Sequence, residues 1–121
     1  MKERSDFIQE YCRAAVAHCE AVEKGNDKKA YKESSNLIRM GKKLETDRLF
    51  AEAVIKELLN NPNQMVLGWA AADALWLNID IENAQTILKE IIETPEFPLL
   101  SFTADMNLKE WRKKQETQNC G

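Results

Sequence analysis

The chain of 121 residues has little of what most enzyme active sites need. It contains one histidine, His18, and four glycines, no two of which are close enough to form a phosphate-binding loop. A cysteine–histidine pair would have to use His18 with Cys19, and adjacent positions of a helix do not face each other. The sequence therefore shows no pattern for nucleophilic or nucleotide-dependent chemistry, and we predict that the protein is not an enzyme.

Cysteine is also scarce, with three residues at Cys12, Cys19 and Cys120. An odd number without a secretory signal is typical of reduced thiols in a reducing compartment. On a helix, Cys12 and Cys19 would share a face about 10 Å apart, which is beyond disulfide reach. No CxxC or HxxxH spacing is present, so we predict small packed thiols, no metal site and no cofactor.

The chain lacks a long apolar run and an excess of positive charge. Its longest uncharged segment, residues 58–72, contains a proline and three asparagines, and is too short and polar to span a bilayer. The first residues, MKERSDF, show no apolar signal core, which predicts a cytoplasmic protein. With 17 Lys and Arg against 20 Asp and Glu the net charge is −3, so neither a membrane nor a nucleic acid is expected as a partner.

What the sequence does contain is helical periodicity. Apolar residues recur at helical spacing in six segments separated by polar turns, and strand-like alternation is absent. The expected helices cover residues 5–24, 28–44, 47–59, 64–77, 81–93 and 99–115. Ser5, Asp27 and Asp80 are expected as N-caps, and residues 116–121 as a frayed tail. The length suits one domain over residues 1–121, with successive helices antiparallel.

The fourth expected helix differs from the others because Asp73 is its only charged residue. A helix that is apolar nearly all round is packed on most sides, so this one is predicted to be central. We interpret Trp111 as a structural residue that closes the C-terminal end. Helical spacing also predicts the large apolar core residues of the second and sixth expected helices. They are Tyr31, Leu37, Ile38 and Leu44 in the second helix, and Phe102, Met106 and Leu108 in the sixth.

Residues 58–72 resemble a HEAT unit, a repeat of two antiparallel helices. The first helix ends in the apolar pair Leu58-Leu59, a polar turn with Pro62 follows, and the second helix has Val66 and then three alanines. A helical pair of this kind cannot bury its apolar face alone, so three pairs would stack together. The resemblance implies an all-α fold, a short right-handed αα-superhelix of about six antiparallel helices.

A closer resemblance covers nearly the whole chain. The matching segments are residues 21–30 (AVEKGNDKKA), residues 66–75 (VLGWAAADAL) and residues 101–106 (SFTADM), followed by Leu108, Glu110 and Trp111. They resemble a small bacterial family of HEAT-like domains whose members are proposed to be immunity proteins. Such proteins bind and neutralise a toxin domain that is encoded beside them.

The family resemblance implies a function and a partner. The chain would be an immunity protein, monomeric when free, that occludes the active site of a cognate toxin, for which a nuclease is one candidate. The alternative is a HEAT-like adaptor or regulatory protein-binding module. HEAT-like alkylpurine DNA glycosylases use an aspartate flanked by aromatic residues, as Asp73 is here, but Asp73 lies in an acidic stretch that disfavours DNA.

Charge is uneven along the chain, which indicates a surface for a partner. Residues 61–95 carry one lysine, Lys89, and five carboxylates: Asp73, Asp80, Glu82, Glu90 and Glu93. An acidic face would complement a basic toxin and speed association. Trp69 and Trp76 share a helical stripe with Asp73, and tryptophan is enriched among interface anchors. We predict that the five carboxylates and these two tryptophans bind the partner, with core packing of the indoles as the alternative.

Overall fold

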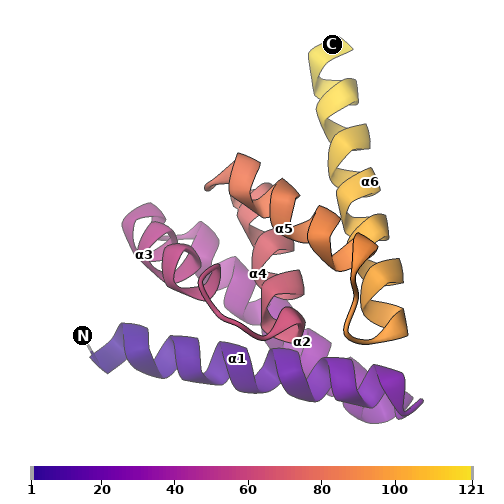
Figure 1. Cartoon of the computed structure of the whole chain (residues 1–121). Helices are drawn as coiled ribbons and strands as arrows, with labels where there is room; N and C mark the ends of the chain where they lie inside the picture. Colours follow the sequence, from indigo (N-terminus) through magenta and orange to yellow (C-terminus); the bar gives the residue numbers. More distant parts are fainter. Residues whose placement is uncertain (1, 121) are drawn as a thin grey trace.

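Six α-helices joined by short connections make up the computed structural model of the protein (Figure 1). The helices are α1 (Lys2–Glu23), α2 (Asp27–Glu45), α3 (Arg48–Leu58), α4 (Gln64–Leu77), α5 (Ile81–Glu93) and α6 (Pro98–Cys120). The structure describes residues 2–120, and the side chains of residues 3–118. This described part contains no strand, so the predicted all-α class is confirmed. None of its helices combines the length and apolar character that crossing a membrane requires.

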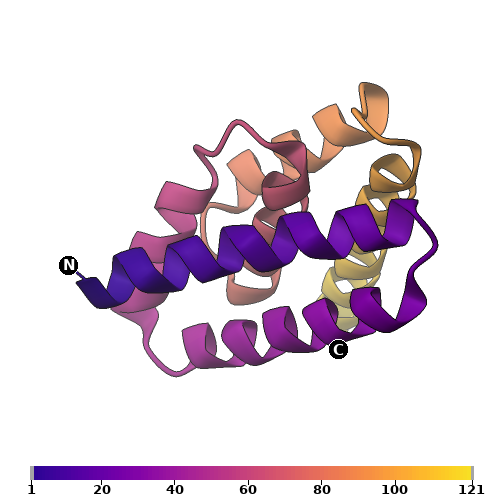
Figure 2. The ribbon, with the colours of Figure 1, turned by 90° about the horizontal axis from the view of Figure 1, so that it is seen from below.

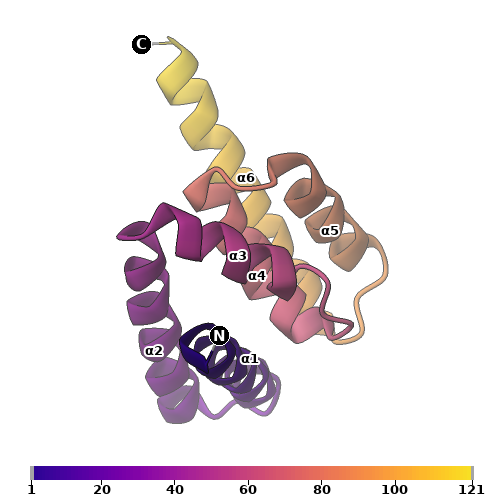
Figure 3. The ribbon, with the colours of Figure 1, turned by 90° about the vertical axis from the view of Figure 1, so that its left-hand side faces the viewer.

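The central position predicted for α4 is confirmed. This helix contacts α1, α3, α5 and α6, and Ala70, Ala71 and Ala74 are fully buried where these neighbours approach. α1 and α2 run antiparallel next to each other (Figure 2). Viewed from the side, α4 lies between this pair and α5 (Figure 3). The arrangement is compatible with a HEAT-like superhelix.

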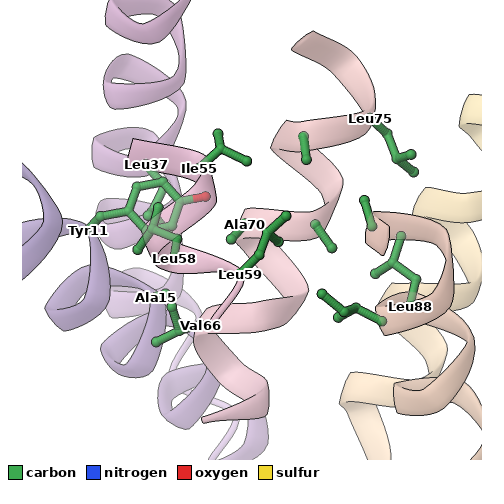
Figure 4. Close-up of a cluster of buried hydrophobic side chains, with 14 of the residues drawn as sticks. Tyr11, Ala15, Leu37, Ile55, Leu58, Leu59, Val66, Ala70, Leu75 and Leu88 are labelled. Atoms are coloured by element: carbon green, nitrogen blue, oxygen red, sulfur yellow. The ribbon is translucent and has the colours of Figure 1, made fainter. Parts of the chain in front are cut away.

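The core is a continuous cluster of apolar side chains on both sides of α4 (Figure 4). Tyr11, Leu37 and Ile55 pack on one side, and Leu88 of α5 packs on the other. Each of these side chains is almost completely buried. Burying a large aliphatic side chain contributes about 1.5–3 kcal/mol to the stability of the fold, so this cluster holds the helices in place.

The N-caps predicted for α1 and α2 are both wrong. Gly25 adopts the left-handed conformation, with φ +73°, as a helix C-terminus favours. This turn brings Asn26, rather than Asp27, to the N-cap of α2, where its side chain accepts a hydrogen bond from the backbone of Lys29. α1 begins at Lys2, so Ser5 lies inside this helix and is not its N-cap.

The cap predicted for α5 is only partly right. Asp80 occupies the N-cap position, but its side chain makes no capping hydrogen bond to the backbone. Its carboxylate instead accepts a hydrogen bond from Asn83 Nδ2, at 3.2 Å. Asp80 has a left-handed backbone, with φ +48°, which differs from the extended backbone of a typical N-cap residue.

α6 is longer than predicted. It starts at Pro98, whose ring suits a first turn, and continues past Gln115 to Cys120, so most of the segment expected to fray is helical. Gly121 lies outside the described residues. Neither glycine nor proline interrupts residues 99–120, which explains the extension. The C-terminal half of α6 projects beyond the other helices (Figures 1 and 3).

The core positions predicted for two helices are wrong at four residues. The exposed side chains are Tyr31 and Ile38 of α2, and Phe102 and Met106 of α6. The buried residues of α2 are Glu33, Leu37, Met40 and Leu44. Those of α6 are Leu100, Ala104, Leu108 and Trp111, so Trp111 is a packed structural residue as predicted. Both helices carry apolar residues on more than one face, and the face that meets a neighbour decides which residues are buried.

Candidate functional site

α1, α4 and α6 together form a pocket of about 220 Å³. Trp69, Asp73 and Trp76 of α4 all line it, so the structure brings together the three residues that sequence spacing placed on one stripe. α1 contributes His18 and Glu23, and most of the remaining lining is apolar. Tyr11 of α1 does not line the pocket but contacts Asp73, one of its lining residues.

Trp69 is fixed against α1 by His18. The indole Nε1 donates a hydrogen bond to His18 Nδ1 at 3.3 Å, and the two rings pack edge to face with centroids 5.1 Å apart. This bond assigns the proton of neutral His18 to Nε2. Desolvation lowers the pKa of His18, which favours the neutral form that can accept from the indole. Trp69 is therefore held as a rigid wall of the pocket.

Asp73 is a largely desolvated carboxylate without a basic partner. Tyr11, which is fully buried, donates its hydroxyl to Asp73 Oδ2 at 2.6 Å. Gly41 of α2 lies opposite, where an added Cβ would be 3.7 Å from Oδ1. No lysine or arginine with a described side chain forms an ion pair with Asp73. Desolvation outweighs the hydrogen bond from Tyr11 and raises the pKa of Asp73 to about 6, with further repulsion from Glu45.

Trp76 lies at the mouth of the pocket, with 45% of the residue exposed. Its ring packs under the ammonium group of Lys114, which lies 4.5 Å from the ring centroid. Arg48 of α3 donates hydrogen bonds to the carbonyls of Leu77 and Asn78, which fixes the end of α4 next to Trp76. The two indoles therefore differ, since Trp69 packs against α1 while Trp76 presents much of its surface to solvent.

Exposed apolar side chains continue from the pocket along α6. Leu99 lines the pocket and is 40% exposed, while Phe102 and Met106 are 64% and 50% exposed. The three residues are spaced i, i+3 and i+7, which places them on one stripe of the helix. We call this stripe together with Trp76 the apolar rim. Sequence reasoning missed the rim because it assigned Phe102 and Met106 to the core, although the second apolar stripe of α6 was the available signal.

The four acidic residues of α5 and its N-terminus lie elsewhere. Asp80, Glu82, Glu90 and Glu93 are exposed, and none of them lines the pocket. None forms an ion pair with any side chain in the described range 3–118. The predicted site thus falls into two parts, the pocket residues of α4 and an acidic outer face of α5.

The part of the chain that the structure describes contains no assembled metal site and no activated thiol. No three His, Cys, Asp or Glu side chains within that part are grouped as metal ligands would be. Burial raises the pKa of Cys12, and raises that of Cys19 to about 11, so both thiols stay protonated at neutral pH. The side chain of Cys120 lies outside the described residues.

Comparison of the chain with protein-family models, with curated proteins and with solved structures gave no significant match. The resemblance to HEAT-like immunity proteins therefore stays a prediction from the sequence motifs.

The chemistry that the pocket supports best is binding. Cys19 and His18 both line the pocket, but the Cys19 thiol points to the carbonyl of Met65 and His18 Nδ1 is occupied by Trp69. The thiol and the imidazole are thus each engaged by the fold rather than by each other. What remains available to a ligand is a carboxylate with one oxygen not bonded to Tyr11, two indoles and an apolar rim.

Proposed function

We propose that the protein is an immunity protein that binds a cognate toxin domain through the pocket and its apolar rim and covers the toxin's active site. The observation that carries the proposal is the rim, where Trp76, Leu99, Phe102 and Met106 are each at least 40% exposed. Large apolar side chains exposed on a surface are typical of interaction sites, and tryptophan is prominent among interface anchors.

The electrostatics of the pocket favour a basic protein over a nucleic acid. Both carboxylates in its lining, Asp73 and Glu23, would repel a phosphate backbone. A glycosylase that holds DNA at Asp73 is therefore disfavoured by the structure's charges. A toxin with a basic surface would gain association rate from the acidic outer face of α5 and affinity from the apolar rim.

The mode of inhibition that suits this fold is steric. The pocket is formed by three helices that share one packed core, so a bound toxin would meet a preorganised surface, which reduces the entropic cost of binding. A HEAT-like adaptor would use the same surface, and the two functions differ only in whether the bound partner loses its activity. The experiment must therefore measure both binding and neutralisation.

The test is growth rescue. The toxin domain encoded beside this gene in its native host is expressed with and without the protein, and complex formation is measured by size-exclusion chromatography, with a free monomer as the expected reference. Wild type should restore growth, and Trp76→Ala should reduce rescue. Leu49→Ala is the matched control, because Leu49 is 79% exposed on α3 and does not line the pocket.

The outcomes separate the functions. A stable complex without rescue would favour the adaptor alternative, and no complex and no rescue would refute the immunity proposal. Rescue that is equal for wild type and Trp76→Ala would exclude the apolar rim as the binding surface.

The acidic outer face of α5 is tested separately. Reversing the charges of Glu82, Glu90 and Glu93 to lysine should slow association and flatten its salt dependence, because rim charges act mainly on the association rate. Since all three side chains are exposed, thermal unfolding should change little. Unchanged association kinetics would show that this face takes no part in binding.

A further inference from the structure

Asp73 is a carboxylate for which the fold supplies a neutral donor and no cation. Tyr11 occupies Oδ2, Gly41 faces Oδ1, and the nearby Glu45 adds negative rather than positive charge. Asp73 is half-buried, and carboxylates that are largely removed from water are normally paired, because losing hydration is costly unless an opposite charge compensates. Asp73 faces the pocket, so a cation entering the pocket could complete the pair.

The aromatic walls of the pocket also suit a cationic ligand. Trp69 and Trp76 lie four residues before and three residues after Asp73, and both line the pocket with it. Indole faces attract cations and stack well on a planar guanidinium. Trp76 already holds one cation in the fold, since the ammonium of Lys114 lies over its ring. The two charged residues that line the pocket, Glu23 and Asp73, are both acidic.

The size of the pocket favours a single side chain. Its volume of about 220 Å³ is below the ~300–1,000 Å³ that is typical of small-molecule and cofactor sites. Arginine suits it better than lysine, because guanidinium is more weakly hydrated than ammonium and offers a planar fork of donors to a carboxylate.

We propose that this pocket binds the guanidinium group of an arginine side chain inserted by the partner protein, with Asp73 as its acceptor and Trp69 and Trp76 as its walls. The inference rests on the proposed function only in that a protein partner supplies the arginine. The Tyr11 hydroxyl then positions the carboxylate, and Leu99, which lines the pocket, contacts the aliphatic part of the inserted side chain.

The first test uses the wild-type protein and three amino-acid probes whose ends are capped: arginine, lysine and citrulline, which has nearly the shape of arginine without its charge. NMR follows the indole N–H signals. Capped arginine should shift the signals of Trp69 and Trp76 saturably, with a dissociation constant on the order of 1 mM. Capped lysine should bind at least about threefold more weakly than capped arginine, and capped citrulline should not bind. Trp111, which is buried and lies outside the pocket lining, is the internal control.

The second test changes the acceptor. Asp73→Asn should weaken the binding of capped arginine by about tenfold or more, because it removes the charge and keeps the shape. Glu57→Gln removes an exposed carboxylate of α3 outside the pocket and should leave the affinity unchanged. The comparison of arginine with citrulline uses wild type alone, so it decides the question even if a variant fails to fold.

Several results would overturn the inference: equal binding of citrulline and arginine, no saturable shift of Trp69 and Trp76 with arginine, or unchanged affinity in Asp73→Asn. These results are distinct from failure of the proposed function. Arginine binding without growth rescue would refute the immunity role alone, whereas rescue without arginine binding would refute the arginine site alone.

Discussion

Replacing Asp73 by asparagine should stabilise the folded protein at neutral pH, although the residue lines the candidate binding site. Desolvation raises the pKa of Asp73 from an ordinary 3.8 to about 6, in spite of the hydrogen bond from Tyr11. The folded state therefore disfavours the ionised form. Asparagine has nearly the same shape, can accept the same hydrogen bond from Tyr11 and carries no charge to desolvate.

The magnitude follows from linkage between protonation and folding. A pKa that is higher in the folded state means that the native state binds the proton more tightly, so stability falls as the pH rises from about 4 to about 6. Each pKa unit corresponds to about 1.4 kcal/mol, which gives a cost of ~3 kcal/mol for ionised Asp73 at pH 7. The pKa of about 6 already includes the favourable hydrogen bond from Tyr11 to the ionised form, so the gain from asparagine at neutral pH should also be ~3 kcal/mol.

The assay is urea unfolding of wild type and Asp73→Asn, followed by far-UV circular dichroism across the range from about pH 4 to about pH 8. All other titrating groups are common to both proteins, so the difference in unfolding free energy reports Asp73 alone. It should be near zero at about pH 4 and reach its full value above about pH 7. A difference that does not depend on pH, or a wild type that is more stable at neutral pH, would refute the reasoning.

Substitutions at three further positions test other contacts of the fold by the same urea unfolding. Tyr11→Phe should lower the free energy of unfolding by ~1–3 kcal/mol at neutral pH, because Asp73 loses its hydrogen-bond donor. In a double-mutant cycle with Asp73→Asn the two effects should be non-additive, and strict additivity would contradict the contact. Arg13→Met should cost ~1–3 kcal/mol, since it leaves the buried carboxylate of Glu33 without its two hydrogen bonds. The pKa of Glu33 is lowered by this pair, so the loss should shrink as the pH falls below about 4.5, and a loss that persists in acid would argue against pairing. Trp111→Phe should cost only about 1 kcal/mol, against ~3–5 kcal/mol for Trp111→Ala, because the buried indole N–H has no partner among the described residues; similar costs for both would show that this N–H is satisfied.

The helices and the place of α4 could be predicted because their causes are local. The glycine at position 25 and the proline at position 62 interrupt helical periodicity, and the structure has connections at both. A helix of fourteen residues with Asp73 as its only charge can be stable in water only if most of its surface is covered. These properties do not depend on where the other helices pack.

The buried faces of α2 and α6 could not be predicted because each helix offers more than one apolar stripe. In α6, Phe102 and Met106 compete with Leu100, Ala104 and Leu108 for the core, and the contact with α4 and α5 decides the outcome. In α2, Arg13 of the neighbouring helix draws Glu33 into a buried position, which no pattern within α2 indicates. Sequence periodicity shows which faces of a helix are apolar, and packing against the neighbouring helices determines which of these faces is buried.

For the candidate site, the sequence determined the composition of one stripe, since residues 69, 73 and 76 share a face on any α-helix. Only the tertiary structure decided what that stripe does. Tyr11, the donor to Asp73, lies 62 residues earlier in the chain, and His18 and Leu99 come from two other helices. The raised pKa of Asp73 and the pocket beside it both depend on residues that are distant in sequence. Desolvation is set by all the atoms around a group in space, and not by the residue spacing along one helix.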